Sequence, residues 1–333
     1  MARSNLLAAK RLMQNLKTAR AGRYRAKAPD DAIGSAPDFD FDVYLKNRVR
    51  LLETTLAQVV GEPRGPAARL LESIRYSLLA GGKRLRPVIA LAACEAVGGE
   101  PEAAMGLACA LEMIHTYSMI HDDLPCMDDD DLRRGKPTNH KVYGEAMATL
   151  AGDALLTDAF GVLARLTPAT VDRSALVETI AELSSAAGSP GMVAGQVVDL
   201  MDEGRAVSVA ELEDLHTHKT GALFVAAAVG GGRLGGGGEA QLAALEVYAR
   251  SLGLAFQVID DLLDVEGSTE QVGKRTQKDG ERGKATYPAL LGIAESRRLA
   301  HRLRDDAVAA LAAFDHRAEP LRRLANLVVE RKQ

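Results

Sequence analysis

Tryptophan is absent from this 333-residue chain, and aromatic residues make up only 4% of it. Stretches in which apolar and polar residues alternate, as they do in half-buried strands, are also scarce. Alanine and leucine are abundant instead, and both favour helix. Because 47% of the residues are apolar, the chain can bury a large core. The composition therefore predicts an all-α protein.

Cysteine is also rare, and the three cysteines are far apart and form no CxxC pair (Cys94, Cys109 and Cys126). This excludes a disulfide framework and a thiolate metal site, and it predicts a reduced protein of the cytoplasm. No uninterrupted apolar run reaches the roughly 18 residues of a membrane helix, so we expect no membrane span. The net charge of −4 gives no reason to expect nucleic acid as a partner.

Acidic residues are missing from the start of the chain, where many basic residues precede the first acid, Asp30. The basic residues are Arg3, Lys10, Arg11, Lys17, Arg20, Arg23, Arg25 and Lys27. We interpret residues 1–37 as a disordered basic tail and residues 38–333 as one folded domain. The alternative is an organelle transit peptide, although serine is sparse in this segment.

Beyond the tail, apolar residues recur at helical spacing almost throughout the chain. The segment 102–121 is long and mostly apolar, which predicts a helix that is buried on several faces. The predicted later helices span residues 146–166, 175–187, 209–229, 240–265 and 289–313. The glycine-rich segment 230–238 lacks the Lys-Ser/Thr ending of a phosphate loop, so we interpret it as a loop between helices. The sequence therefore predicts a large single-domain helical bundle.

Two clusters of aspartates follow or end apolar helices. The first spans residues 122–131, and the second contains Asp260, Asp261 and Asp264. Asp260 and Asp264 are four residues apart, so one helical face carries both. Asp122 and Asp128 are six apart, but the proline between them, at position 125, ends the helix and allows the chain to fold back.

Carboxylates that lie close together repel each other unless a cation is bound. Carboxylate oxygens suit Mg²⁺, which takes only one or two of them and completes its shell with water and phosphate. The alternative interpretation of each cluster is a solvated acidic loop. That alternative explains poorly why two such clusters are each joined to an apolar helix. The sequence therefore predicts Mg²⁺ ions held around a diphosphate.

Basic residues accompany both acidic clusters. Lys83, Arg84 and Arg86 follow a glycine pair, and Arg133 and Arg134 follow the first cluster. Further lysines stand at positions 219, 274, 278 and 284. Arginine binds phosphate oxygens in a bidentate way and lysine binds them as a point charge. Because these cations lie beside the aspartate clusters, we expect diphosphate binding.

Taken together, the motifs resemble those of the trans-isoprenyl diphosphate synthase family, in particular bacterial farnesyl and plant-type geranylgeranyl diphosphate synthases. They are Gly81–Pro87, Asp122–Gly135, Gly152–Asp153, Lys219–Gly221, Phe256–Asp264, Gly273–Lys274 and Gly283–Pro288. The resemblance implies the isoprenoid synthase fold around a central apolar cavity, three Mg²⁺ ions per site and a homodimer. It also implies isopentenyl diphosphate and an allylic diphosphate as substrates.

The resemblance implies a role for each matching residue. Isopentenyl diphosphate would be bound by Lys83, Arg86, His115 and Arg134. The allylic diphosphate would be held by Arg133, Lys219, Thr220, Gln257, Lys274 and Lys284. Metal ions would be bound by Asp122, Asp128 and Asp260, with a catalytic contribution from Asp264 and Lys219. The implied reaction ionises the allylic diphosphate, condenses the cation with isopentenyl diphosphate and eliminates a proton.

Tyr117 lies five residues before Asp122, which places it about 7 to 8 Å deeper along a helix. Its ring could form the floor of the product cavity, or it could be an ordinary core residue. In the resembling family an aromatic residue here accompanies a C15 product. We therefore predict farnesyl diphosphate as the product, with geranylgeranyl diphosphate as the alternative.

Three rival functions remain open from the sequence. Glu112–His115 and Glu213–His216 are ExxH pairs, the pattern of di-iron carboxylate bundles. A terpene cyclase would ionise a diphosphate without a second substrate, and the separate basic site near Lys83 argues against it. A non-catalytic partner subunit would have no need of two intact acidic clusters.

Overall fold

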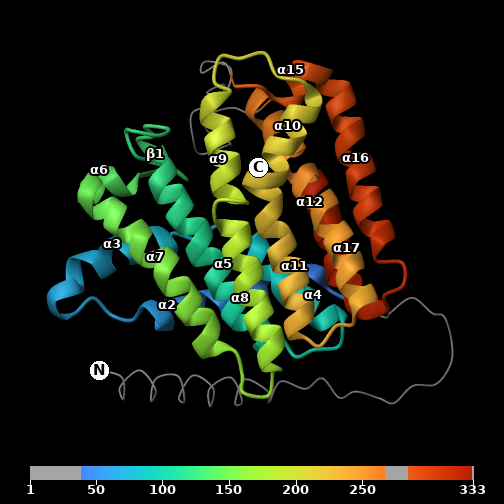
Figure 1. Ribbon diagram of the computed structural model, residues 1–333, viewed down its shortest axis with the longest axis horizontal. Coiled ribbons are helices and arrows are strands. Elements are labelled where there is room, and N and C mark those ends of the chain that lie inside the picture. The colour runs from blue at the N-terminus through green and yellow to red at the C-terminus, as the bar shows by residue number, and fades with distance from the viewer. Residues whose placement is uncertain (1–38, 267–283, 332–333) are drawn as a thin grey trace. The chain divides into compact units, whose positions relative to one another are not determined.

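The computed structural model describes residues 39–266 and 284–331 (Figure 1). The chain divides into two units, Met1–Asp40 and Phe41–Gln333, and the second contains the folded core. Within the described residues of that unit the structure is helical apart from one short hairpin, so the all-α prediction is confirmed. The division of the chain into a tail of 37 residues and a catalytic domain stays a prediction.

The elements follow one another along the chain with short connections. The α-helices are α2 (Phe41–Val60), α3 (Ala68–Leu78), α4 (Leu85–Ala96), α5 (Pro101–Asp122), α6 (Asn139–Tyr143), α7 (Glu145–Leu166), α8 (Arg173–Ala187), α9 (Met192–Met201), α10 (Val209–His216), α11 (Ala222–Leu234), α12 (Glu239–Glu266), α15 (Tyr287–Leu291), α16 (Ile293–Ala310) and α17 (Glu319–Glu330). The short helical turns are η2 (Gly65–Ala67), η3 (Thr217–Gly221) and η4 (His316–Ala318). Strands β1 (Leu132–Arg133) and β2 (Lys136–Pro137) pair in antiparallel fashion.

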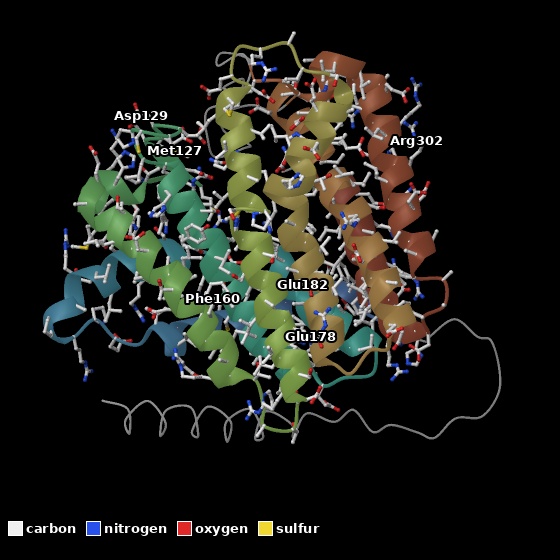
Figure 2. The ribbon with its side chains drawn as sticks, in the orientation of Figure 1. Met127, Asp129, Phe160, Glu178, Glu182 and Arg302 are labelled. Carbon is white, nitrogen blue, oxygen red and sulfur yellow. The ribbon has the colours of Figure 1, made fainter. Side chains whose placement is uncertain are left out.

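Helix α11 lies at the centre of this unit and packs against α4, α5, α8 and α12 (Figure 1). Nearly all of its residues are buried, as expected of a helix that other helices surround. Arg233 at its last turn forms ion pairs with Glu178 and Glu182 on α8, both labelled in Figure 2. Helix α11 is thus held to α8 by ion pairs as well as by apolar packing.

The glycine-rich segment 230–238 is not wholly a loop, and that prediction was wrong. Residues 230–232 belong to α11, and only the chain from Gly235 connects to α12. The glycines permit close packing: a Cβ on Gly231 would clash with the backbone of Ala90 on α4, and one on Gly230 would meet Leu107 on α5. The absence of side chains thus serves helix contact at these two positions and not chain flexibility.

Other predicted boundaries also differ. The segment 209–229 is divided by the π-helical turn η3, and the helix expected over 289–313 is broken at Gly292 into α15 and α16. Gly292 has φ +80°, a conformation that glycine adopts without strain. The sequence patterns also failed to indicate α9 and α17, which are short, and α9 proves to contribute residues to the site.

Among the residues that the structure describes, three helices, α5, α7 and α12, are long and apolar enough to cross a membrane by length and composition alone. In α5, 78% of the most apolar window is buried inside the protein. Its apolar composition therefore has a structural reason, because it forms part of the core behind the first aspartate cluster.

Candidate active site

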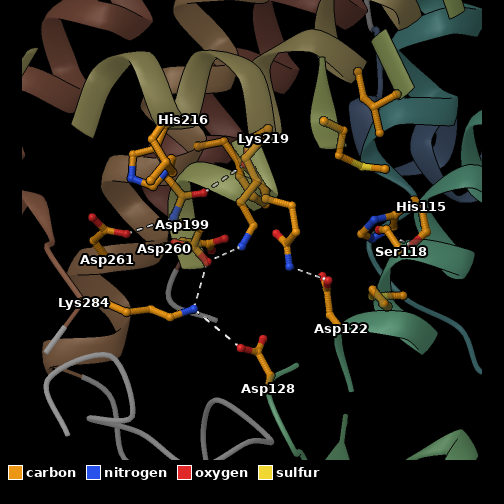
Figure 3. Close-up of a pocket in the computed structure, with 18 of the residues that line it drawn as sticks. His115, Ser118, Asp122, Asp128, Asp199, His216, Lys219, Asp260, Asp261 and Lys284 are labelled. Atoms are coloured by element: carbon orange, nitrogen blue, oxygen red, sulfur yellow. Dashed lines mark hydrogen bonds and ion pairs between the residues drawn. The ribbon is translucent and has the colours of Figure 1, made fainter. Parts of the chain in front are cut away.

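The predicted site residues meet in one cavity of about 1040 Å³. Those lining it are Lys83, Arg86, His115, Tyr117, Asp122, Asp128, Arg133, Arg134, Lys219, Thr220, Gln257, Asp260, Asp264 and Lys284. They come from both halves of the chain, and Figure 3 shows a part of the arrangement. Lys274, for which we also predicted substrate binding, lies outside the described residues, as does Lys278.

The first acidic cluster folds back on itself as its spacing predicted. Helix α5 ends at Asp122, and the backbone N–H of Asp128 donates to the carbonyl oxygen of Asp122 at 2.8 Å. The turn includes Asp129 at φ +46°, a left-handed conformation that aspartate tolerates better than most residues. The fold-back brings the side chains of Asp122 and Asp128 to the same edge of the cavity (Figure 3).

The carboxylate of Asp122 is in an environment that disfavours its charge. Burial and the neighbouring Asp128 raise its pKa to about 6, although Lys219 acts in the opposite direction. Gln196 on α9 donates a hydrogen bond from Nε2 to Oδ1 of Asp122 at 2.6 Å. The cations of the cavity therefore do not fully compensate this carboxylate.

The aspartates of the second cluster have different partners. Asp260 is 42% exposed toward the cavity and forms an ion pair with Arg331 at 2.6 Å. Asp261 is buried and accepts hydrogen bonds from the backbone N–H of Tyr287 and from Gln257 Nε2. Asp264 is buried at the edge of the cavity. The geometry thus gives Asp261 a structural role and leaves Asp260 the most accessible of the three.

Asp199 on α9 joins two lysines that come from distant parts of the chain. Its Oδ2 accepts from Lys219 Nζ at 2.8 Å and from Lys284 Nζ at 2.9 Å (Figure 3). Lys284 also lies 3.5 Å from Asp128. The two lysines lower the pKa of Asp199 below its usual range despite its burial. This carboxylate therefore holds two cations beside the first acidic cluster.

Gln196 and Asp199 were not among the residues predicted from the sequence. Their only signal was a pair of polar residues three apart in an otherwise apolar segment, Met192–Met201. Such spacing places both side chains on one helical face, which here faces the cavity. Polar residues on the exposed side of an amphipathic helix give the same pattern, so the signal was weak.

A group of arginines also lines the cavity. The guanidinium carbon of Arg86 lies 4.9 Å from the centre of the Phe224 ring. Burial lowers the pKa of His115 well below its usual value, and the positive charges of Arg86 and Arg134 lower it further. His115 is therefore neutral at physiological pH. Arg84, which is nearly fully buried, forms an ion pair with Glu112 and holds the start of α4.

The turn of the β1–β2 hairpin presents the paired arginines. Arg134 and Gly135 have φ of +53° and +72°, the signature of a two-residue hairpin turn. Arg134 donates to the carbonyl oxygen of Gly81, and a Cβ on Gly82 would lie 2.6 Å from its guanidinium. Arg133 instead forms an ion pair with the buried Asp123 at 2.6 Å. The glycine pair of the basic motif thus makes room for Arg134.

Tyr117 lies five residues before Asp122 on α5. It lines the cavity, is only 7% exposed, and meets the ring of His121 edge-on at 5.7 Å between centroids. Apolar residues that also line the cavity include Met192, Val193 and Leu223. The cavity therefore has both charged and apolar residues in its lining.

A family model described as polyprenyl synthetase matches residues 67–313. The chain belongs to the polyprenyl synthetase family. The resemblance drawn from the motifs is therefore confirmed, and with it a transferase that builds isoprenyl diphosphates.

Relatives and solved structures of this family match most of the chain. The chain is 49% identical over 294 residues to geranylgeranyl pyrophosphate synthase 11, chloroplastic, from Arabidopsis thaliana, which covers 87% of this chain and 82% of the relative. A solved FPP/GFPP synthase from Zymomonas mobilis superposes with a TM-score of 0.78 at 39% identity, covering 87% of this chain and 98% of that one. A geranyltransferase from Helicobacter pylori, solved with magnesium and isoprenyl diphosphate, gives a TM-score of 0.78 at 32% identity and covers 90% and 99%.

Mg²⁺, which the polyprenyl synthetase family implies, fits the residues of this cavity. No three His, Cys, Asp or Glu side chains in the described part of the chain lie close enough to form a complete metal site. Mg²⁺ does not need one, because it keeps water and substrate phosphate among its ligands. The carboxylates of Asp122, Asp128 and Asp260 all line this cavity, and their oxygens are the ligands that Mg²⁺ prefers.

The di-iron alternative has no support in the described residues. A di-iron site needs several carboxylate and histidine ligands around two metals, and no such cluster is found there. Glu112 is instead paired with Arg84, and neither ring nitrogen of the buried His216 has a hydrogen-bond partner among the described residues. The two ExxH pairs therefore have separate structural surroundings.

Proposed function

We propose that this polyprenyl synthetase condenses isopentenyl diphosphate with allylic diphosphates in a Mg²⁺-dependent reaction, and that geranylgeranyl diphosphate is its main product. The observation that carries the reaction is the single cavity in which two acidic clusters and two basic groups meet. A terpene cyclase would need only one diphosphate site, and the arginine group near Lys83 supports a second.

Two groups of basic and polar residues would each suit one substrate. Lys83, Arg86, His115 and Arg134 would bind the diphosphate of isopentenyl diphosphate. Arg133, Lys219, Thr220, Gln257, Lys274 and Lys284 would hold the allylic diphosphate. Arginine and lysine placed in advance stabilise charge that develops on the leaving group without having to reorganise.

Asp122, Asp128 and Asp260 are the residues that would hold Mg²⁺, which when bound supplies positive charge to the departing diphosphate. Lys219 and Lys284, fixed by Asp199, would add positive charge at the same place. Apolar lining residues such as Met192 and Leu223 would help to exclude water from the reacting carbon atoms. Holding both substrates in one cavity supplies the proximity that condensation requires.

Two observations bear on the product length, and they support different products. The relatives at about half identity are named geranylgeranyl pyrophosphate synthases, which supports a C20 product. Tyr117 at the cavity wall supports farnesyl diphosphate as the second candidate, in line with our expectation from the sequence. We give the relatives greater weight, because their identity extends over most of the chain and not over one position.

The names of the relatives bear on location and assembly as well. They are chloroplastic enzymes, which supports the organelle alternative for the basic residues 3–27 over a cytoplasmic protein. One is the large subunit of a heterodimeric synthase, whereas our expectation from the motifs was a homodimer. We propose a homodimer and a targeting role for residues 1–37.

The test is incubation of the purified protein with Mg²⁺, isopentenyl diphosphate and dimethylallyl diphosphate, followed by chain-length analysis. We expect C20 as the main product and no product when isopentenyl diphosphate is omitted. A predominantly C15 product would establish the second candidate. Release of diphosphate from a longer allylic substrate alone, with a cyclic hydrocarbon as product, would contradict the proposal.

A further inference from the structure

Arg86, on the first turn of α4, differs from the arginines near it in the kind of contact that holds its side chain. Arg84 and Arg133 form ion pairs with buried carboxylates, and Arg134 donates to a backbone carbonyl oxygen. Within the residues that the structure describes, the guanidinium of Arg86 has neither a hydrogen bond nor an ion pair, and its Nε is buried. Its N–H donors are therefore not used by the described part of the protein.

An aromatic ring takes the place of a polar partner. The guanidinium carbon of Arg86 lies over the ring of Phe224 on α11, 4.9 Å from its centre. That ring is fully buried and packs against the ring of Phe256 on α12, at 5.4 Å between centroids. The face of an aromatic ring is negative and attracts a cation, most strongly where water is excluded. A ring fixed by its own neighbours thus fixes the guanidinium above it.

This kind of contact suits a cation that has to bind an anion. A carboxylate partner uses N–H donors and neutralises the charge, whereas a ring face attracts the charge and uses no donor. Burial lowers the pKa of Arg86, although Glu112 and Asp260 act in the opposite direction. A buried guanidinium with unused donors is costly, and hydrogen bonds to a bound anion would offset that cost.

We propose that Phe224 is a positioning residue for Arg86, and that its ring holds the guanidinium where the diphosphate of isopentenyl diphosphate would bind. This inference rests on the proposed role of Arg86 in binding that substrate. Without the ring, the long side chain has to be ordered when the substrate binds, which weakens binding. Because the contact is the same before and during the reaction, its loss affects KM and not kcat.

The experiment is steady-state kinetics with Mg²⁺, in which isopentenyl diphosphate and dimethylallyl diphosphate are varied in turn. The variant Phe224→Leu removes the ring face and keeps an apolar side chain. We expect its KM for isopentenyl diphosphate to rise roughly three- to tenfold, with kcat and the other KM nearly unchanged. The matched control is Phe314→Leu, because Phe314 packs against the core but is not among the described residues that line the cavity. We expect both KM values of the control to be those of the wild type.

The same assay on Arg86→Met, with and without Phe224→Leu, shows whether the ring acts through the arginine. With Met at position 86 the ring has no cation to hold, so Phe224→Leu should raise KM no further. An equal rise in both backgrounds, or an equal rise in Phe314→Leu, would overturn the inference. If Arg86→Met leaves the KM for isopentenyl diphosphate unchanged, the proposed role of Arg86 fails, and the inference with it. If Arg86→Met raises this KM while Phe224→Leu does not, the inference alone fails.

A further set of variants covers the case in which Phe224→Leu does not fold. Phenylalanines that carry one, two or three fluorine atoms on the ring are placed at position 224 by nonsense suppression. They keep nearly the same shape and make the ring face less negative, which weakens its attraction for a cation. We expect the KM for isopentenyl diphosphate to rise with each added fluorine. A KM that does not depend on fluorination would contradict the role of the ring face.

Discussion

Several charged side chains in the cavity form ion pairs with residues that are far away in the sequence. Asp122 and Asp128 could be selected from their spacing, because carboxylates clustered next to an apolar helix repel each other unless a cation is bound. Asp199 and Arg331 could not be selected, because a lone aspartate and an arginine near the end of the chain are ordinary surface residues. Their importance appears only when their partners are known, Lys219 and Lys284 for one and Asp260 for the other.

Tyr117 allows a direct test of product length. Replacing Tyr117 by Ala removes the ring from the cavity wall and leaves space for a longer chain. We expect the main product to lengthen by at least one isoprene unit, measured by mass spectrometry of the dephosphorylated products. Tyr143→Ala is the matched control, because Tyr143 lies on α6, packs edge-on to Tyr76 and is not among the described residues that line the cavity. An unchanged product length in Tyr117→Ala would show that this ring is not the floor.

Among the helices, the contact between α9 and the π-helical turn η3 is the one most closely connected to the chemistry. Such turns occur often at functional sites, and this one includes Lys219 and Thr220. Gly195 on α9 lies directly against the backbone of Lys219, where a Cβ would clash. This close approach of η3 to α9 explains why Lys219 can reach Asp199, which lies on α9 one turn after Gly195. The periodicity of the sequence predicted helices here but not the turn, because a π-helical turn has no apolar repeat of its own.

We predict that Gly195→Ala pushes α9 and η3 apart. We expect the unfolding free energy to fall by about 1 to 3 kcal/mol, as in other overpacked cores. We also expect kcat to fall about tenfold or more, because Lys219 is displaced. Urea unfolding and steady-state kinetics measure the two effects.

Gly161→Ala is the control for this substitution. Gly161 is also a helical glycine, on α7, but its added Cβ would meet only the flexible end of the Arg165 side chain. We expect the control to be neutral or more stable by up to about 1 kcal/mol, since alanine favours helix. If Gly195→Ala behaves like Gly161→Ala, the close approach of α9 to η3 does not matter for activity.

At the scale of the whole folded unit, the charged site lies between helices that a bound ligand would connect. Helix α5 supplies Asp122, α9 supplies Asp199 and α12 supplies Asp260. The carboxylates face one cavity, and a metal-bound diphosphate would bridge them. Ligand binding should therefore stabilise the entire unit and not one helix alone.

We predict that Mg²⁺ together with inorganic pyrophosphate raises the melting temperature, measured by calorimetry. At ligand concentrations of about one hundred times Kd the gain is about 2.7 kcal/mol. For a chain of this size that corresponds to a rise of roughly 5 °C. The double variant Asp122→Asn/Asp260→Asn should show no rise while melting near the wild-type temperature without ligand. An equal rise in the double variant would refute metal binding by these aspartates.

Local sequence was sufficient for the helical class, because apolar spacing and residue type act over neighbouring positions. It was also sufficient for the fold-back from Asp122 to Asp128 and for the shared face of Asp260 and Asp264, which depend on a proline and on helical geometry. Which charged residues pair with each other, by contrast, was decided by the tertiary structure. Lys284 reaches Asp199 across 85 positions and Arg331 reaches Asp260 across 71. Such contacts form because burial of the whole core brings α9, α12 and the C-terminal end together, and no short stretch of sequence contains that information.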